Sequence, residues 1–253
     1  MTLSLVNLTK RYGAQAVVDE VSFDAPSNGL TGLIGPNGAG KSTLFSLISG
    51  FIAADDGCVS FDGAPLDRLS APERARRGLV RTFQTPKEYA HLSVRDNLMA
   101  AAPDQSGESL ATLFLQPARV AREERALREK VEGTLAMLRL DGVADQRASG
   151  LSGGQKKLLE LGRALITGAR MILLDEPFAG VNPVLIERIV ELIRDLNRQG
   201  VGFLIIEHDL GALSRLVDAI HVMDRGRLIA SGAPREVLAD FAVREAYLGG
   251  APA

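Results

Sequence analysis

The stretch LTGLIGPNGAGKST, residues 30–43, decides the fold of this 253-residue chain. Leu30–Ile34 is a short, mainly apolar run with the pattern of a β-strand. Residues 35–43 then fit the pattern G-x-x-x-x-G-K-[ST], and a helical run over residues 43–49 follows. A strand, a glycine-rich turn and a helix in this order predict a loop whose backbone N–H groups surround phosphate oxygens.

The parts of this loop have separate tasks. Glycines let the backbone fold closely around phosphate oxygens. Lys41 supplies a point charge for the β- and γ-phosphates of a nucleotide, and Ser42 supplies a hydroxyl for Mg²⁺. The predicted phosphate-binding residues are Gly35, Pro36, Asn37, Gly38, Ala39, Gly40, Lys41, Ser42 and Thr43.

A second apolar run, Met171–Leu174, ends on two carboxylates, Asp175 and Glu176. Because ligands bind at the carboxyl ends of parallel strands, we expect Asp175 near a Mg²⁺ ion. Glu176 is then aimed at the space beyond the γ-phosphate, where it could polarise an attacking water. An acidic pair before Pro177 can also serve as a helix cap, and this alternative stays open.

Strand and helix patterns alternate along most of the chain, which predicts an α/β fold with a mainly parallel sheet. The expected strands are Leu3–Asn7, Val17–Phe23, Leu30–Ile34, Val59–Phe61, Leu79–Phe83, Met171–Leu174, Gly202–Ile206, Ala219–Met223 and Arg227–Ser231. The first two and Val59–Phe61 are expected to form an antiparallel part, with a hairpin turn at Asp62-Gly63. Residues 85–167 are predicted to be a helical subdomain, inserted into an α/β core of residues 1–84 and 168–253. Core and subdomain together are expected to form a single domain of residues 1–253.

Composition excludes several classes of protein. With 29 Lys+Arg against 31 Asp+Glu, the net charge of −2 argues against a nucleic-acid binder driven by a basic surface. The one cysteine, Cys58, cannot form an intramolecular disulfide, and we expect it to be a small core residue. The sequence lacks an apolar run of about 18 residues and the basic start of a signal peptide, so we expect a soluble intracellular protein.

The motif LSGGQ at residues 151–155 discriminates between families of phosphate-binding loop proteins. By itself it predicts a flexible turn before a helix, Gln155–Leu165, whose N-terminus offers free N–H groups to an anion. It resembles the signature motif of ATP-binding cassette (ABC) ATPases, and Gly154 precedes Asp175 by 175 − 154 = 21 residues, as in that family. The resemblance covers nearly the whole chain and implies a P-loop NTPase core with an antiparallel β part and an inserted helical subdomain.

The resemblance implies a role for each further motif. Tyr12 would stack on adenine, Gln84 would contact Mg²⁺ and the attacking water, and His208 would contact the γ-phosphate. The expected catalytic residues are Glu176, His208, Gln84 and Lys41. The expected ligands of Mg²⁺ are Ser42, Gln84 and Asp175. Besides the phosphate loop, the expected ATP-binding residues are Tyr12, Ser152, Gly153, Gly154 and Gln155.

The resemblance also implies partners. Two ABC ATPase chains, either two copies or two paralogues, would pair head-to-tail around two ATP molecules. Ser152-Gly153-Gly154 of each chain would complete the other chain's site. Transmembrane permease subunits would dock near residues 84–98, a substrate-binding protein would take part indirectly, and no nucleic acid is expected. The implied location is peripheral, on the cytoplasmic face of the inner (cell) membrane.

Smaller features resemble one branch of the family. In the run PFAGVNP, residues 177–183, Asn182 stands where many ABC ATPases carry aspartate, which puts a charge-dependent contact between the two ATP sites in doubt. This run, the insertion around Ala102–Arg122 and the ending Tyr247-Leu248-Gly249 resemble branched-chain amino acid importer ATPases. Urea and amide importer ATPases belong to the same group. Lipopolysaccharide-extracting ATPases share residues 178–181 and the ending.

The implied function is the ATP-hydrolysing, energy-coupling subunit of an ABC importer for branched-chain amino acids. Urea or amide import and lipopolysaccharide extraction are the alternatives within the family. A soluble ABC protein of translation or DNA repair is disfavoured, because the chain has neither a second cassette nor a long coiled-coil insert. A P-loop kinase gives no reason for residues 151–155.

Overall fold

The computed structural model describes residues 2–82 and 88–248. The chain divides into two compact units, a core unit of residues 1–84 and 170–253 and a helical unit of residues 85–169. The core unit is built from two β-sheets with helices, and the helical unit contains helices and an isolated Ser93–Arg147 bridge in its described part. The predicted α/β fold class is confirmed.

The larger sheet has the strand order β10-β9-β3-β8-β7-β6. Its strands are β3 (Leu30–Ile34), β6 (Leu79–Arg81), β7 (Met171–Asp175), β8 (Gly202–Ile206), β9 (Ala219–Asp224) and β10 (Arg227–Gly232). All neighbours pair in parallel except β10, which is antiparallel to β9. Every residue of β3, β7 and β8 is buried, in agreement with the mainly apolar sequences of these strands. The expected strand end at Phe83 lies outside the described residues.

The smaller, antiparallel sheet has the strand order β2-β1-β4-β5. Its strands are β1 (Thr2–Tyr12), β2 (Gln15–Pro26), β4 (Asp56–Phe61) and β5 (Ala64–Pro65). The expected turn at Asp62-Gly63 joins the last two, which pair through Phe61 and Ala64. The expectation for Cys58 was wrong: its side chain is exposed. Successive side chains of a strand point to opposite faces, so the burial of Val59 places Cys58 on the other face.

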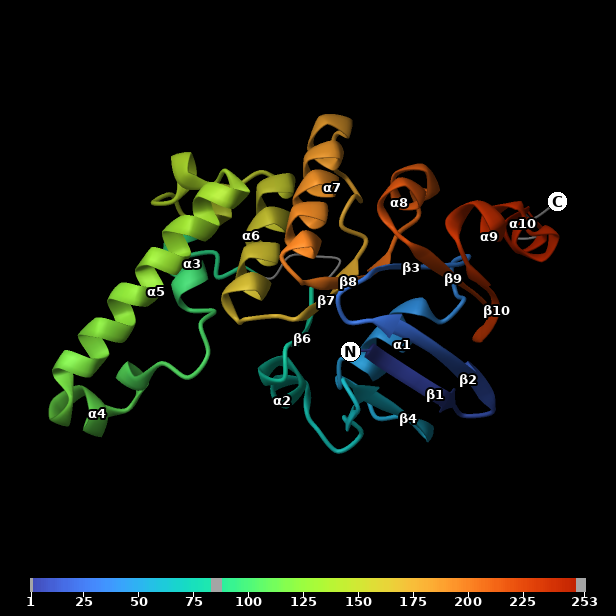
Figure 1. Ribbon diagram of the computed structural model, residues 1–253, viewed down its shortest axis with the longest axis horizontal. Coiled ribbons are helices and arrows are strands. Elements are labelled where there is room, and N and C mark those ends of the chain that lie inside the picture. The colour runs from blue at the N-terminus through green and yellow to red at the C-terminus, as the bar shows by residue number, and fades with distance from the viewer. Residues whose placement is uncertain (1, 83–87, 249–253) are drawn as a thin grey trace. The chain divides into compact units, whose positions relative to one another are not determined.

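Helix α1 (Lys41–Ile48) lies between the two sheets (Figure 1). Leu44, Phe45 and Leu47 share one hydrophobic core with the inward side chains of β1 and β4 and with alternate residues of β7 and β8. On the other face of the larger sheet lie α7 (Pro183–Arg198) and α8 (Leu210–Leu216) (Figure 1). The remaining helices of this unit are α2 (Ala71–Arg76), α9 (Pro234–Ala239) and α10 (Phe241–Leu248). The loop after β3 is therefore held between packed layers.

The helical unit contains α3 (Val94–Met99), α4 (Leu110–Leu115), α5 (Pro117–Leu138) and α6 (Gly153–Ile166). It also has three short 3₁₀ turns, at Ser106–Glu108, Asp141–Val143 and Ala148–Gly150. Helix α6 approaches α5 closely at Gly162, where an added Cβ would lie 2.6 Å from Leu138 Cδ1. The charged side chains at the start of α5 are exposed and form a solvated helix face.

None of the helices within the described ranges is long and apolar enough to cross a bilayer.

Candidate functional site

The phosphate loop turns between β3 and α1 at places where no side chain fits. Gly35 has φ +152°, and a Cβ on it would lie 2.1 Å from the carbonyl oxygen of Met223 on β9. Gly40 has φ +98°, and a Cβ there would lie 2.3 Å from the carbonyl oxygen of Val17 on β2. Both contacts are with backbone, which cannot move aside as the tip of a side chain can. The glycines of the motif are thus required by close packing as well as by backbone conformation.

The N-terminus of α1 is open to an anion. Gly40 is its N-cap and has no side chain to bond the first N–H groups, and the first turn contains no acidic residue. Lys41 follows directly, and its ammonium donates to the carbonyl oxygens of Gly35 at 2.7 Å and Pro36 at 3.0 Å. Free N–H groups, the helix dipole and a cation together favour a polyphosphate at this place.

Burial lowers the pKa of the Lys41 ammonium, while the charges of Glu176 and Asp175 oppose this shift. A phosphate next to Lys41 would raise the pKa again, because an anion favours the charged form. The amine is thus held by two neutral carbonyls until a stronger acceptor arrives.

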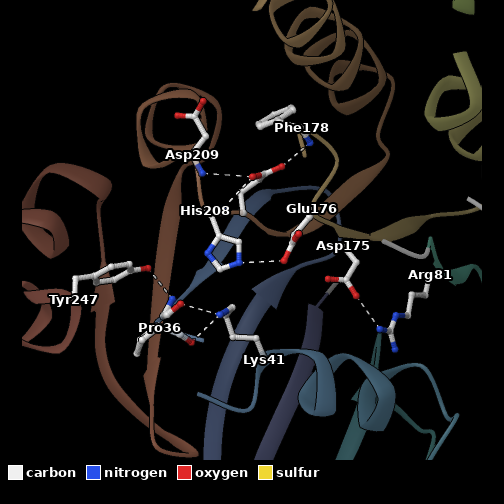
Figure 2. A network of polar contacts seen from close by, with 11 residues as sticks. Pro36, Lys41, Arg81, Asp175, Glu176, Phe178, His208, Asp209 and Tyr247 are labelled. Atoms are coloured by element: carbon white, nitrogen blue, oxygen red, sulfur yellow. Dashed lines mark hydrogen bonds and ion pairs between the residues drawn. The ribbon is translucent and has the colours of Figure 1, made fainter. Parts of the chain in front are cut away.

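Asp175 ends β7 and is held by Arg81, which ends the neighbouring strand β6. Arg81 Nη2 lies 2.8 Å from Asp175 Oδ2, and the two side chains are only 9% and 7% exposed (Figure 2). Arg81 Nη1 also donates to Ser46 Oγ of α1 at 2.9 Å. The sequence analysis missed Arg81. Its signal was a charged residue at the end of an apolar strand, beside the strand that ends on the carboxylates.

Glu176 lies next to His208, a contact that the sequence analysis did not predict. His208 Nε2 is 3.0 Å from Glu176 Oε1 (Figure 2). The donor and acceptor of this contact depend on the tautomer of the imidazole, and an ionised carboxylate, which only accepts hydrogen bonds, would require a proton on Nε2. Glu176 has φ +51°, a strained conformation for a residue with a side chain, and its N–H donates to the Ile206 carbonyl at 2.9 Å. Such strain persists where the surroundings fix it, and it is frequent at functional sites.

The loops that carry Glu176 and His208 are joined by Glu207, a second residue that the sequence analysis missed. Its buried carboxylate accepts hydrogen bonds from the N–H of Phe178 at 2.5 Å and from the N–H of His208 at 3.0 Å (Figure 2). A carboxylate directly after the apolar strand β8 was the available signal. Glu207 thereby ties the backbone after β7 to the backbone after β8.

The second predicted anion site begins helix α6, in the helical unit. Ser152 is the N-cap, and its side chain forms a capping box with Gln155, with hydrogen bonds of 3.3 and 2.9 Å. Apart from its two chain neighbours and the backbone of its own helix, no atom of the described residues lies within 4 Å of a Cβ added to Gly153. Packing against the described part of the chain therefore does not require glycine at position 153, whereas close approach of a ligand to the backbone would.

Two predicted residues are less informative. Tyr12 ends β1 beside Gly13, its side chain is 54% exposed, and the ammonium of Lys10 lies 5.8 Å from its ring centre. An exposed ring of this kind is free to stack on a base. Gln84 lies outside the described residues.

The oxygen donors at the core-unit site fit Mg²⁺. Ser42 offers an exposed hydroxyl and Asp175 a carboxylate, and both are hard ligands of the type that Mg²⁺ prefers together with substrate phosphates. Within residues 2–82 and 88–248, no group of three His, Cys, Asp or Glu side chains is arranged to hold a metal ion.

Asn182 has a local structural role at the position where the sequence departs from many ABC ATPases. It is the N-cap of α7, and its Oδ1 accepts a hydrogen bond from the N–H of Leu185 at 2.9 Å. Pro183 follows at the first helical position, where its missing N–H costs nothing. The asparagine thus supplies the acceptor that an aspartate would supply, without the charge.

Comparisons with known proteins agree with the motifs. Residues 18–179 match the family described as ABC transporter, and residues 227–253 match the family described as branched-chain amino acid ATP-binding cassette transporter. The chain is 39% identical over 247 residues to the probable branched-chain amino acid transport ATP-binding protein LivG of Archaeoglobus fulgidus, covering 98% of this chain and 95% of the relative. It is 37% identical over 251 residues to the lipopolysaccharide export system ATP-binding protein LptB of Escherichia coli K12, covering 98% and 97%.

Two solved structures are similar over almost their whole length. A nucleotide-free ATP-binding cassette from an ABC transporter has a TM-score of 0.83 at 38% identity, with 98% of this chain and 99% of that chain covered. The ADP conformation of an ATP-binding cassette of an ABC transporter has a TM-score of 0.83 at 37% identity, with the same coverage of 98% and 99%.

The role of Asn182 leads to a stability prediction. Asn182→Ala removes the cap of α7 and should lower the free energy of unfolding by about 1 kcal/mol. Asn182→Asp keeps the acceptor and adds a favourable charge at the helix N-terminus, so its free energy of unfolding should equal or exceed that of the natural protein. Urea unfolding of the three proteins measures the difference, and equal midpoints for the alanine variant and the natural protein would contradict the capping role.

Proposed function

The chain belongs to the family of ABC transporter ATP-binding proteins, and we propose that it is the energy-coupling subunit of an importer for branched-chain amino acids. As a member of this family it is an ATPase. The observation that carries the importer assignment is the 39% identity to archaeal LivG proteins over nearly the full length. The match of residues 227–253 to the branched-chain amino acid transporter family supports it.

A second candidate function is lipopolysaccharide export. The similarity to LptB proteins is nearly as high, at 37% identity to the Escherichia coli protein over 98% of this chain. Urea or amide import is a third possibility within the importer group. These functions share one ATPase chemistry, so the residues of the site do not separate them.

In the proposed mechanism, ATP binds to the core unit at the phosphate loop. Lys41 would release the carbonyls of Gly35 and Pro36 and donate to the β- and γ-phosphates, since charged oxygens are stronger acceptors than neutral carbonyls. The free N–H groups at the start of α1 would bind the same phosphates. Tyr12 would stack on the adenine.

Hydrolysis needs a group that orients and deprotonates water, and Glu176 is the proposed one. The hydrogen bond from its N–H to the Ile206 carbonyl holds Glu176, which has a strained backbone conformation, directly after β7. The carboxylate would take a proton as the water oxygen bonds to the γ-phosphorus and the bond to ADP breaks. His208 and Lys41 would stabilise the charge on the transferred group.

Mg²⁺, bound with ATP through Ser42, Asp175 and Gln84, would supply neutralisation of negative charge on the phosphate oxygens. Arg81 holds the Asp175 carboxylate in place at the edge of the sheet.

The two anion-binding helix starts lie in different units of the chain. We therefore propose that two ATPase chains pair head-to-tail, so that Ser152-Gly153-Gly154 of one chain meets the γ-phosphate bound by the other. ATP would then hold the pair closed, and hydrolysis would release it. The pair would couple to transmembrane permease subunits and, through them, to a substrate-binding protein, with this chain on the cytoplasmic face of the membrane.

The role of Glu176 can be tested by its isosteric amide. Glu176→Gln should leave ATP binding within about twofold but lower the turnover number by about a hundredfold or more, the usual contribution of a general base. Glu187→Gln is the matched control, because Glu187 is an exposed residue of α7 paired with Arg215. Phosphate release under saturating ATP measures turnover, and a Glu176→Gln protein that hydrolyses ATP at the natural rate would exclude this role.

Uptake in cells that lack the gene tests the transported substrate. We expect loss of labelled leucine uptake, restored by the natural gene but not by Lys41→Ala, because the variant cannot hold the phosphates of ATP. Loss of urea uptake with normal leucine uptake would instead assign the amide branch. Normal uptake of both, with lipopolysaccharide retained in the inner membrane, would favour the export function.

A further inference from the structure

The C-terminal helix reaches the phosphate loop. Tyr247 of α10 accepts a hydrogen bond from the N–H of Gly35 through its hydroxyl oxygen at 2.8 Å, across 212 positions of sequence (Figure 2). We infer that Tyr247 is a positioning residue, which fixes the entry of the phosphate loop and thereby increases the affinity for ATP. This goes beyond the proposed transport function, and it rests only on the ATPase activity of the family. The sequence analysis assigned Tyr247 no role beyond the family resemblance of the ending Tyr247-Leu248-Gly249. The last residue of this ending, Gly249, lies outside the described residues.

Gly35 is restrained at three places, its N–H, its carbonyl and its α-carbon. Its carbonyl accepts a hydrogen bond from Lys41, and its α-carbon is packed so tightly that a Cβ would lie 2.1 Å from the Met223 carbonyl oxygen. Tyr247 and Lys41 approach the loop from opposite sides (Figure 2). The phenol therefore restrains the Gly35 N–H, whereas the other two contacts restrain its carbonyl and its α-carbon.

The phenol is itself well anchored. Val243, one turn before Tyr247 on α10, is buried, as is Val237 on the preceding helix α9. Burial raises the pKa of the Tyr247 phenol, and the Gly35 N–H opposes this shift, so the hydroxyl keeps its proton at neutral pH. A water molecule could also accept from the Gly35 N–H, but it would not connect the loop to a packed helix. The connection is what reduces the freedom of the loop before ATP arrives.

This restraint differs from the contacts that bind phosphate. If the Lys41 ammonium donates to the phosphates of ATP, the carbonyl of Gly35 loses its hydrogen-bond donor. The N–H of Gly35 belongs to the preceding peptide group, which joins residues 34 and 35. Its hydrogen bond to Tyr247 therefore does not depend on Lys41. It can therefore persist through binding and hold the start of the loop while Lys41 changes partners.

The test removes only the hydroxyl, with Tyr247→Phe in the full chain. Calorimetric titration with a non-hydrolysable ATP analogue and Mg²⁺ should show about fivefold weaker binding, which corresponds to about 1 kcal/mol, the typical net value of one hydrogen bond. The KM for ATP should rise by a similar factor while kcat stays unchanged, because saturating ATP restores the loop. Glu245→Gln is the control, since Glu245 is an exposed residue of the same helix α10 and has no role in the proposed site.

The outcomes are distinct. Weaker binding and a higher KM in Tyr247→Phe alone would support the inference. An unchanged affinity in Tyr247→Phe, with or without a loss of Tm, would overturn it, because a merely structural hydroxyl lowers stability without touching ATP. An equal loss of affinity in Glu245→Gln would overturn it as well. If the natural protein failed to bind the analogue, the ATPase assignment itself would fall, and the positioning role with it.

Discussion

The site depends on one steric constraint, the close crossing of the phosphate loop and strand β9 at Gly35. A side chain at this position would collide with the Met223 carbonyl at 2.1 Å, so the chain can enter the loop only as glycine. Strand β3 is buried between β8 and β9, which fixes where the loop begins. Because β7, β8 and β9 run parallel to β3, their carboxyl ends are brought to the same edge of the sheet.

Charge balance at that edge follows from the same arrangement. The Lys41 ammonium, the Asp175 carboxylate and the Glu176 carboxylate interact across the carboxyl ends of the strands, and Arg81 neutralises Asp175 from the neighbouring strand. A buried ion pair of this kind contributes little net stability, but the loss of one partner leaves a costly uncompensated charge. The arrangement thus holds each acidic group in a defined place before any nucleotide binds.

Much of this could be predicted from the sequence, and the rest could not for physical reasons. Strands Leu30–Ile34 and Gly202–Ile206 were predicted residue for residue, because strands buried on both faces are mainly apolar. The burial of Cys58 was mispredicted, because the sequence of a short strand does not tell which of its two faces packs against the core. Arg81 and Tyr247 were missed because their partners, Asp175 and Gly35, are 94 and 212 positions away, and only the folded chain brings them together. The sequence predicted separate roles for Glu176 and His208, and their mutual contact is seen only in the folded chain, whereas Gln84 lies outside the described residues.

In the proposed pair, one chain carries two halves of an ATP site, which a second copy of the chain completes. The direct test is ATP hydrolysis by a mixture of two inactive variants, Lys41→Ala and Gly153→Asp. The second should fold normally, because position 153 has open space and an aspartate is favourable at a helix N-terminus, yet its charge would repel the γ-phosphate. In a mixed pair, one of the two sites combines an intact loop with an intact signature motif. Mixing should therefore restore part of the ATPase activity, and a mixture as inactive as either variant alone would contradict the pairing.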